Sequence, residues 1–535
     1  MLSKKKDKII NDPIYGFVTL ENGIITDLID HPFFQRLRKI SQLGLSYLVY
    51  PGAHHTRFHH AIGCLHLMNK AIIQIKQKGH IITNEESEAL KIAILLHDIG
   101  HGPFSHALEN SIVSNVSHEH LSLLFMHTLN EQFNGKLSLA IEIFNNKHPK
   151  KFLHQLVSSQ LDMDRLDYLK RDSFFSGVTE GNIGTERIIN MLDVVDDKLV
   201  VEEKGIYSIE KFLIARRLMY WQVYLHKTVV AAENMLIKVL KRAKYLMMNN
   251  HDIFATPALS LFLKNNFSIS DFENKNNLLE SFAELDDNDI FICLKYWIKE
   301  DDFVLSNLSE MILNRNILKI KVQKYSFNDS EIKEKEIELL KKNNISSEEI
   351  NYFIFTDKVS NSTYNIEKSN INILMKNGDV IDITSASDQF NIDALGFGCA
   401  IYAISNSEKC YSLIAFSQYL DPAKRTDRVI ANAWDATFVL YDGIPSEADI
   451  KRLEREAPKQ EAGRYGPNDL VLSRANKSVR LFEHVVQSLS KGKQPDRKMI
   501  AETGYLMRTT AVYANGKFGL ADRTDYANQP ALTAP

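Results

Sequence analysis

The chain has 535 residues, of which 44% are hydrophobic and 24% are charged, and its net charge is −3 at pH 7. This length is sufficient for two or more domains with a large buried core. A nearly neutral chain without a basic stripe is not expected to bind nucleic acid. The four cysteines match no zinc-binding spacing, and neither a signal peptide nor a long apolar span is recognised. The sequence therefore predicts a cytoplasmic protein that does not enter a membrane.

The histidines are unevenly distributed along the chain. Fifteen of the eighteen lie at or before His154. Isolated histidines are usually surface or core residues, but this concentration favours a metal or phosphate site in the N-terminal part.

Helices predominate among the elements predicted before residue 250. A short strand is predicted at residues 17–20, and Pro32 lies in the first turn of a helix that runs to about residue 41. Thr56 is a suitable N-cap and Gly79 a suitable stop for the next helix. Further helices are predicted at residues 86–96, from residue 118 onwards, at residues 161–172 and over residues 206–247.

The remaining sequence mixes strands and helices. Strands at residues 320–325, 352–355 and 371–375, a helix at 329–342 and a hairpin turn at Asn377-Gly378 predict an α+β lobe over residues 250–392. Lysine outnumbers arginine more than threefold up to residue 390, whereas the two are about equally common afterwards. This step predicts a separate α+β module at residues 393–535, which is either a native domain or a fusion. Its predicted elements are strands at 400–404, 411–416 and 436–441 and helices at 445–455 and 469–490.

One stretch, LLHDIGHGPFSH at residues 95–106, is rich in metal-ligating side chains. Its glycines allow tight turns, and Pro103 prevents continuation of the preceding helix. Successive side chains on a helix point about 100° apart. His97 and Asp98 therefore cannot cage an ion alone, and other segments must supply the missing ligands.

Two other predicted helices offer those ligands. His60 lies three residues after Arg57 and shares its face, a pairing that suits a phosphate held against a metal. Asp164 lies on a helix face with Tyr168 and Asp172, which would form a wall for a metal and a sugar or base. Simpler interpretations exist for each motif, namely polar helix residues and an acidic solvated face. The combined set is typical of a centre for Zn²⁺ or another first-row divalent ion: His60, His97, Asp98 and Asp164.

Three further histidines would surround a phosphorus centre placed there, namely His101, His106 and His118. Glu109 lies three residues after His106 and could orient it as a general acid. The set predicts a metal-dependent phosphohydrolase, against the alternative of a purely structural polar core.

The motifs resemble those of a known family. His60, His97-Asp98 and Asp164 match the H…HD…D signature of the HD-domain superfamily. The runs NDPIYGFVTL, FQRLRKISQLG, PGAHHTRFHHAIG, HDIGHGPFSH, SHEH and DMDRLDYLKRD resemble its branch of SAM-and-HD-domain dNTP triphosphohydrolases. The resemblance covers residues 8–240 well, extends loosely to residue 392 and leaves out the tail.

The resemblance implies a mainly α fold, with an HD-domain helical core at residues 1–249 and the smaller α+β lobe at 250–392. The C-terminal α+β module at 393–535 is of unknown type, and its prediction rests on composition and pattern alone. It implies cleavage of dNTPs at the α-phosphorus to deoxynucleoside and inorganic triphosphate. The cofactor would be a divalent metal ion (Mn, Fe, Zn, Ni or Mg). The protein would form a homo-oligomer, either a dimer or a tetramer.

The resemblance also assigns roles to single residues. His106 matches the proton donor, with Glu109 where the family has an aspartate, and His101 and His118 match further catalytic histidines. Substrate-binding positions are matched by Arg57 at the phosphates, Gln42 and Leu43 beside the deoxyribose 3′-hydroxyl and sugar, Tyr168 and Asp172 on the same wall, and Tyr224, which would exclude a ribose 2′-hydroxyl. The family's regulatory site for GTP or dGTP is matched by four residues, namely Lys8, Asp30, Gln35 and Arg38. The run FQRLR is equally compatible with a helix-packing motif.

Two other functions fit the same sequence. One is the same fold acting on another nucleotide or phosphoester, and the other is a catalytically silent scaffold that binds nucleotides or nucleic acid. The intact ligand set argues against the silent scaffold.

Overall fold

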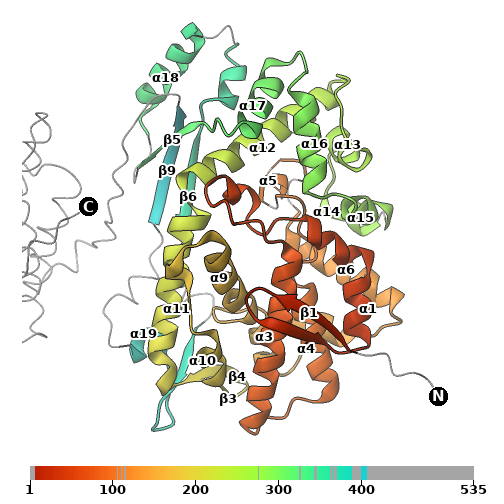
Figure 1. The fold of residues 1–535 in the computed structure, drawn as a ribbon, viewed down its shortest axis with the longest axis vertical. Helices are drawn as coiled ribbons and strands as arrows, with labels where there is room; N and C mark the ends of the chain where they lie inside the picture. The colour runs from red at the N-terminus through yellow and green to blue at the C-terminus, as the bar shows by residue number, and fades with distance from the viewer. Residues whose placement is uncertain are drawn as a thin grey trace, which may run out of the picture. The chain divides into compact units, whose positions relative to one another are not determined.

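The computed structural model describes residues 7–104, 106–109, 111–113, 116–274, 276–323, 327–342, 346–361, 364, 370–387 and 399–406. The chain divides into two compact units, Met1–Cys410 and Tyr411–Pro535, and all described residues lie in the first. Among the described residues helices predominate, and three small sheets accompany them (Figure 1). The prediction of a mainly α fold is confirmed.

Three helices form the centre of the N-terminal part: α3 (Arg57–Gln77), α4 (Asn84–Leu96) and α9 (Met163–Ser176). Helix α3 packs against both α4 and α9. Thr56 occupies the N-cap of α3 as predicted, and its backbone N–H donates to His59 Nδ1. Because the cap and the apolar period are both local, these helices lie close to their predicted positions.

The other helices of this part range from single turns to the 22-residue helix α12. They are α1 (Ile24–Asp30), α2 (Pro32–Gln35), α5 (His106–Glu109), α6 (His118–Gln132), α7 (Ser138–Phe144), α8 (Lys151–Val157), α10 (Thr185–Asn190), α11 (Ile206–Met219) and α12 (Lys227–Met248). Single turns of 3₁₀-helix are η1 (Arg36–Lys39), η2 (Gly44–Leu48), η3 (Thr179–Gly181) and η4 (Glu203–Gly205), and η5 (Tyr220–Tyr224) is a π-helix.

Two predicted long helices are divided in the structure. The helix expected from Pro32 to about residue 41 consists of α2 followed by η1. The helical region at residues 206–247 consists of α11, η5 and α12, and His226 caps α12 with its side chain. The π-helical turn places an extra residue in the winding, which a regular 3.6-residue period does not anticipate.

Three sheets accompany the helices. Strands β1 (Lys8–Asp12) and β2 (Gly16–Leu20) form a hairpin. A second sheet has the order β3 (Leu192–Val195), β4 (Lys198–Glu202), β7 (Asn372–Leu374) and β8 (Val380–Asp382), with only β4 and β7 parallel among these pairs. The predicted Asn377-Gly378 turn joins β7 to β8, and Gly378 has a φ of +91°. The third sheet has the order β5 (Lys319–Gln323), β9 (Cys399–Asn406) and β6 (Thr356–Asn361).

The C-terminal lobe differs from its prediction in two places. A strand was predicted at residues 352–355, but Tyr352 ends the 3₁₀-helix η6 (Glu349–Tyr352), residues 353–355 form a turn, and the strand begins at Thr356. The strand predicted at 400–404 belongs to β9, which pairs with β5 and β6 of the lobe although the sequence assigned it to the tail module. A strand can pair with the free edge of any sheet that lies beside it in the fold, and amino-acid composition does not show which sheet that is. The tail elements predicted after residue 410 lie outside the described residues.

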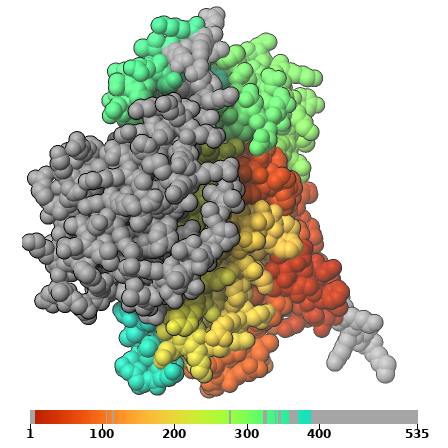
Figure 2. Space-filling view, turned by 60° about the vertical axis from the view of Figure 1, so that its left-hand side comes forward, coloured from red at the N-terminus to blue at the C-terminus, as the bar shows by residue number. Residues whose placement is uncertain are grey.

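The lobe and the N-terminal part share one hydrophobic core. Helix α12 packs against α13 (Pro257–Lys264) and α17 (Phe303–Leu313), and α17 packs against α16 (Asp287–Trp297). The remaining helices of the lobe are α14 (Ile269–Asn274), α15 (Asn276–Ala283), α18 (Asp329–Lys342) and α19 (Ile383–Ala386). In Figure 2 the segments near residue 200 (yellow) adjoin the N-terminal segments (red to orange), in agreement with the packing of α10 and β3 on α3. Among the described residues, no helix is both long and apolar enough to span a membrane.

An ion pair between α12 and α17 makes stability dependent on pH. Arg242 Nε donates to both carboxylate oxygens of Asp302, at 3.0 and 3.1 Å. Burial would raise the pKa of Asp302, but the hydrogen bonds from Arg242 lower it below its ordinary value. A lowered folded-state pKa stabilises the fold above the unfolded-state pKa of about 4, and this contribution is lost as the pH falls through the folded-state pKa.

We therefore expect Arg242→Met to lower the free energy of unfolding at pH 7 by about 1–2 kcal/mol. The difference from wild type should shrink as the pH is lowered from 5 to 3. Urea unfolding at several pH values measures both effects, and a difference that stays constant with pH would contradict the assignment.

Candidate metal centre

The four predicted metal ligands converge in the structure. His60 lies in α3, His97 follows α4 as its C-cap, and Asp164 lies in the first turn of α9. Asp164 Oδ1 is 3.1 Å from His60 Nε2 and 3.6 Å from His97 Nε2. The Asp98 carboxylate approaches the same two nitrogens, with distances of 3.9 Å to His60 and 3.5 Å to His97. The packing of α3 against α4 and α9 thus collects ligands from three separate motifs.

The ring nitrogens of the two histidines suit metal binding. His97 Nδ1 contacts the carbonyl oxygen of Ile94 at 2.7 Å, and His60 Nδ1 contacts Asp167 Oδ2 at 2.8 Å. These acceptors place the ring proton on Nδ1 and leave the Nε2 lone pairs available as ligands. Nε2 of His97 is buried and has no hydrogen-bond partner among the described residues. Two imidazoles and two carboxylates are a donor set that fits a divalent ion.

Cys64 adjoins this centre although the sequence did not predict it. The donor atoms of His60, Cys64, His97 and Asp164 all lie within 4.8 Å of one another. Cys64 Sγ is almost equally distant from the two ring nitrogens of His60, at 3.5 and 3.6 Å, so it lies beside the ring and not in line with Nε2. Burial also raises the pKa of the thiol, which disfavours the ligating thiolate. The predicted four residues remain the better donor set.

The two carboxylates are held in their ionised form. Burial would raise the pKa of Asp164, but the adjacent imidazoles of His60 and His97 lower it below its ordinary value. Burial would also raise the pKa of Asp98, but interactions with His101, His97 and Arg57 lower it well below its ordinary value. Ionised carboxylates are the form that binds a cation.

A buried network of Asp167, Arg171 and Asp12 holds the Nδ1 side of the His60 ring. Asp167 accepts from Arg171 Nε at 2.8 Å, and Arg171 Nη1 donates to Asp12 at 2.8 Å. All three side chains are buried. A Cβ atom at Gly63 would lie 2.0 Å from Asp167 Oδ1, so glycine leaves the space that this network needs. The four-residue spacing of Asp167 and Arg171 signals their pairing, whereas no local pattern links them to Asp12.

The predicted catalytic histidines are only partly brought together. The rings of His101 and His118 stack with centroids 3.9 Å apart and an angle of 17°. Glu109 Oε1 is 2.9 Å from His118 Nδ1, so its described partner is His118, whereas the sequence predicted that it orients His106. His106 begins α5, but its side chain lies outside the described residues.

This second cluster is better suited to protons and phosphate than to an ion. A metal lies near the plane of each imidazole that binds it, and two nearly parallel rings cannot both meet that condition for one ion. Burial and the nearby Arg57 lower the pKa of His101 to about 3, so this ring is neutral near pH 7. His101 Nε2 lies 3.3 Å from Asp98 Oδ1, which joins the cluster to the metal centre.

Two arginines stabilise the histidine-rich loop. Arg57 Nη1 donates to Asp98 Oδ2, as expected for a cation beside the phosphate site. Arg36, which the sequence did not single out, donates to the carbonyl oxygens of Ile99 and His101 at 2.7 and 2.8 Å. Its guanidinium lies over the rings of Phe125 and Phe282. The loop is therefore anchored through its backbone as well as its side chains.

The predicted sugar-side residues occupy one region near the end of α9. Tyr224 OH donates to Asp172 Oδ2 at 2.7 Å, and the rings of Tyr168 and Tyr224 are 6.1 Å apart. Gln42 Oε1 is buried without a hydrogen-bond partner among the described residues. Leu43, its neighbour, is partly buried against the core. Since Asp172 and Asp164 share one helix, the sugar side and the metal centre are joined by α9.

The residues predicted for a guanine nucleotide form two pairs. Lys8 contacts Asp30 at the surface, and Arg38 Nε donates to Gln35 Oε1 at 2.9 Å. Arg38 also covers the ring of Phe58, at 3.5 Å from its centroid. These contacts are compatible with a packing role for FQRLR, and the regulatory site stays a prediction.

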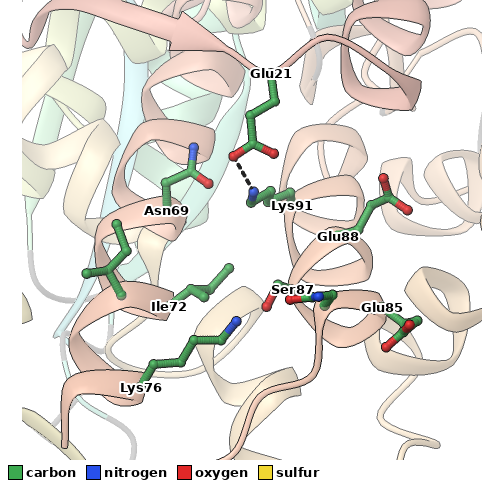
Figure 3. Close-up of a pocket in the computed structure, with 10 residues that line it drawn as sticks. Glu21, Asn69, Ile72, Lys76, Glu85, Ser87, Glu88 and Lys91 are labelled. Carbon is green, nitrogen blue, oxygen red and sulfur yellow. Dashed lines mark hydrogen bonds and ion pairs between the residues drawn. The ribbon is translucent and has the colours of Figure 1, made fainter.

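A separate cavity of about 680 Å³ lies between α3 and α4 (Figure 3). Lys91 Nζ is paired across it with Glu21 Oε1 at 2.7 Å. It is lined by Glu21, Asn69, Ile72, Ile73, Lys76, Asn84, Glu85, Ser87, Glu88 and Lys91, none of which is a candidate site residue. The cavity is therefore distinct from the metal centre.

Known proteins resemble this chain in sequence and structure. A family model described as HD domain matches residues 57–172, and one described as HD associated region matches residues 183–257. A phosphohydrolase from Bacteroides thetaiotaomicron, known from its crystal structure, has 52% sequence identity to this chain. The two structures superpose with a TM-score of 0.73, and the match covers 75% of this chain and 100% of the other. An uncharacterised protein of Bacillus subtilis is 32% identical over 71% of this chain and 88% of its own length.

A further relative is named after an enzymatic activity. A Dictyostelium discoideum protein named as a homologue of a deoxynucleoside triphosphate triphosphohydrolase is 34% identical over 45% of this chain and 50% of its own length. This chain thus spans about half of that relative.

Proposed function

This chain belongs to the HD-domain family of phosphohydrolases, and on that premise we propose that its substrates are deoxynucleoside triphosphates. Water would attack the α-phosphorus, the bond from phosphorus to the 5′ oxygen would break, and a proton would pass to that oxygen. The products are a deoxynucleoside and inorganic triphosphate. The observation that carries the proposal is the shared helix α9, which presents Asp164 to the metal centre and Asp172 to the sugar side.

The metal ligands in this proposal are His60, His97, Asp98 and Asp164. Once bound, a divalent ion would lower the pKa of a water molecule and polarise a phosphoryl oxygen. Imidazole ligands suit Zn, Fe and Ni, and carboxylates also accept Mn and Mg. The residues therefore define the class of ion, and metal analysis of the purified chain would identify it.

Side chains around the centre would bind the phosphates and transfer the proton. Arg57 places a positive charge beside Asp98, where the phosphates of the substrate would be neutralised. His101 is neutral, and its single N–H can donate a hydrogen bond to a phosphoryl oxygen. Glu109 fixes the ring of His118, and this pair supports proton transfer towards the leaving 5′ oxygen, the step for which His106 is the predicted donor.

Regulation and assembly form the second part of the proposal. The exposed Asp30 carboxylate would accept the N–H groups of a guanine edge after release from Lys8, with Gln35 and Arg38 beside it. GTP or dGTP would then act as the effector. A homo-oligomer of two or four chains is the expected assembly, as in the resembling family.

The function is tested by product analysis. We expect the Mn²⁺-loaded chain to convert each dNTP into deoxynucleoside and intact triphosphate, resolved by ion-exchange chromatography. Addition of GTP or dGTP should raise the rate if the guanine site exists. Successive release of single phosphates would indicate a general phosphatase, and turnover of a different phosphoester alone would favour another HD-domain substrate.

A further inference from the structure

His55 joins the two sides of the proposed sugar site, although no motif singled it out. Its buried Nε2 lies 2.7 Å from Asp172 Oδ1. Its backbone carbonyl oxygen accepts a hydrogen bond of 3.0 Å from the backbone N–H of Gln42. One residue therefore contacts both Gln42, through the backbone, and Asp172, through the side chain.

The His55 ring has little freedom to move. It stacks on Phe175, with centroids 4.5 Å apart and an angle of 16° between the rings. A Cβ atom at Gly52 would lie 2.6 Å from the carbonyl oxygen of Phe175, so the loop before His55 lies directly against the end of α9. These contacts set the position from which His55 reaches Asp172.

The existing hydrogen bonds leave both Asp172 and Gln42 able to accept another hydrogen bond. A carboxylate only accepts, so Nε2 of His55 carries the proton that is donated to Asp172. Tyr224 OH occupies the other carboxylate oxygen at 2.7 Å, which holds Asp172 from both sides. Each carboxylate oxygen has two lone pairs, so Asp172 can still accept a further hydrogen bond. Gln42 Oε1 is buried without a partner among the described residues, and a buried acceptor of this kind is costly until a donor reaches it.

We propose that His55 is a positioning residue for substrate specificity, which holds Gln42 and Asp172 in one arrangement that recognises the 3′-hydroxyl of the deoxyribose. This inference rests on the proposed function. A hydroxyl can donate to one of these acceptors and accept from the amide of Gln42. A site whose polar groups are built for a substrate hydroxyl rejects an analogue that lacks it, because those groups are then left unpaired. A 2′,3′-dideoxynucleotide is such an analogue.

The experiment compares dATP with 2′,3′-dideoxy-ATP on the full Mn²⁺-loaded chain. His55→Phe keeps a ring on Phe175 and removes the donor to Asp172, whereas His55→Gln restores an N–H donor. His54→Phe is the matched control, since His54 is the exposed neighbour and stacks on Tyr47. We expect His55→Phe to lower the ratio of kcat/KM for dATP over the dideoxy analogue about tenfold, the effect of roughly one hydrogen bond. His55→Gln should recover most of the ratio, and His54→Phe should leave it unchanged.

The outcomes separate this inference from the function on which it rests. An unchanged ratio in a folded His55→Phe variant would overturn the positioning role while leaving dNTP hydrolysis intact. A wild-type chain that hydrolyses no dNTP would instead count against the proposed function. If His55→Phe does not fold, or if turnover is absent, ¹⁵N-histidine NMR of the wild type decides. We expect the Nε2–H signal of His55 to shift with dATP and to stay in place with the dideoxy analogue, and equal responses would overturn the inference.

Discussion

Replacing His97 and Asp98 together by alanine should release the metal and lower dNTP turnover by at least about a thousandfold. Both side chains lie within 4 Å of His60 Nε2 or Asp164 Oδ1, and only those two ligands would remain. Two ligands do not retain a divalent ion against dialysis. A divalent ion bound there would contribute several kcal/mol of transition-state stabilisation, and each 1.36 kcal/mol corresponds to about a tenfold change in rate.

Metal content per chain, measured by mass spectrometry after dialysis, and initial rates test this expectation. His127→Ala is the matched control, because His127 is an exposed histidine on α6. Asp98 also pairs with Arg57, so circular dichroism must show that the double variant is folded. Full metal content in the double variant would show that the ligands are assigned wrongly.

Replacing Arg171 by methionine should give the largest loss of stability, about 3–5 kcal/mol. Arg171 is fully buried and pairs with both Asp167 and Asp12, whose side chains are also buried. Its removal leaves two carboxylates in the interior without their cation. Asp167 orients His60, so metal affinity should also fall, by about 10- to 100-fold.

Fluorescence-monitored urea unfolding measures the loss. Lys70→Met removes an exposed ion pair with Glu186 and should cost less than about 1 kcal/mol. A similar small loss for both variants would show that the buried network contributes no more than a surface pair. Competition with a metal chelator reports the affinity separately from stability.

Local signals in the sequence were enough to locate the central helices. Thr56 marks the start of α3, and the apolar period of residues 86–96 marks α4, because capping and amphipathicity depend on neighbouring residues. The residue types of His60, His97-Asp98 and Asp164 also indicate a metal site, since few other roles require two imidazoles beside carboxylates. The mainly α fold and the HD-domain family were accessible at this level.

Long-range pairing is where sequence patterns were insufficient. The strand beginning at Thr356 and the membership of β9 in the lobe sheet depend on partners more than 30 residues away. Packing also gives Glu109 a partner that helical spacing did not indicate, because α6 brings His118 to it, while the predicted contact with His106 lies outside the described side chains.

The sequence by itself determined the mainly α fold and the central helices, and it predicted a metal donor set on them, because composition, caps and period are local properties. Only the tertiary structure decided how they are supported. Asp12 in β1 reaches Arg171 in α9, and His55 in a loop reaches Asp172, through contacts that no local pattern encodes. Such buried polar groups are stable only when their partners are supplied by other segments of the fold. The residues that position the site are therefore visible only after the helices have packed.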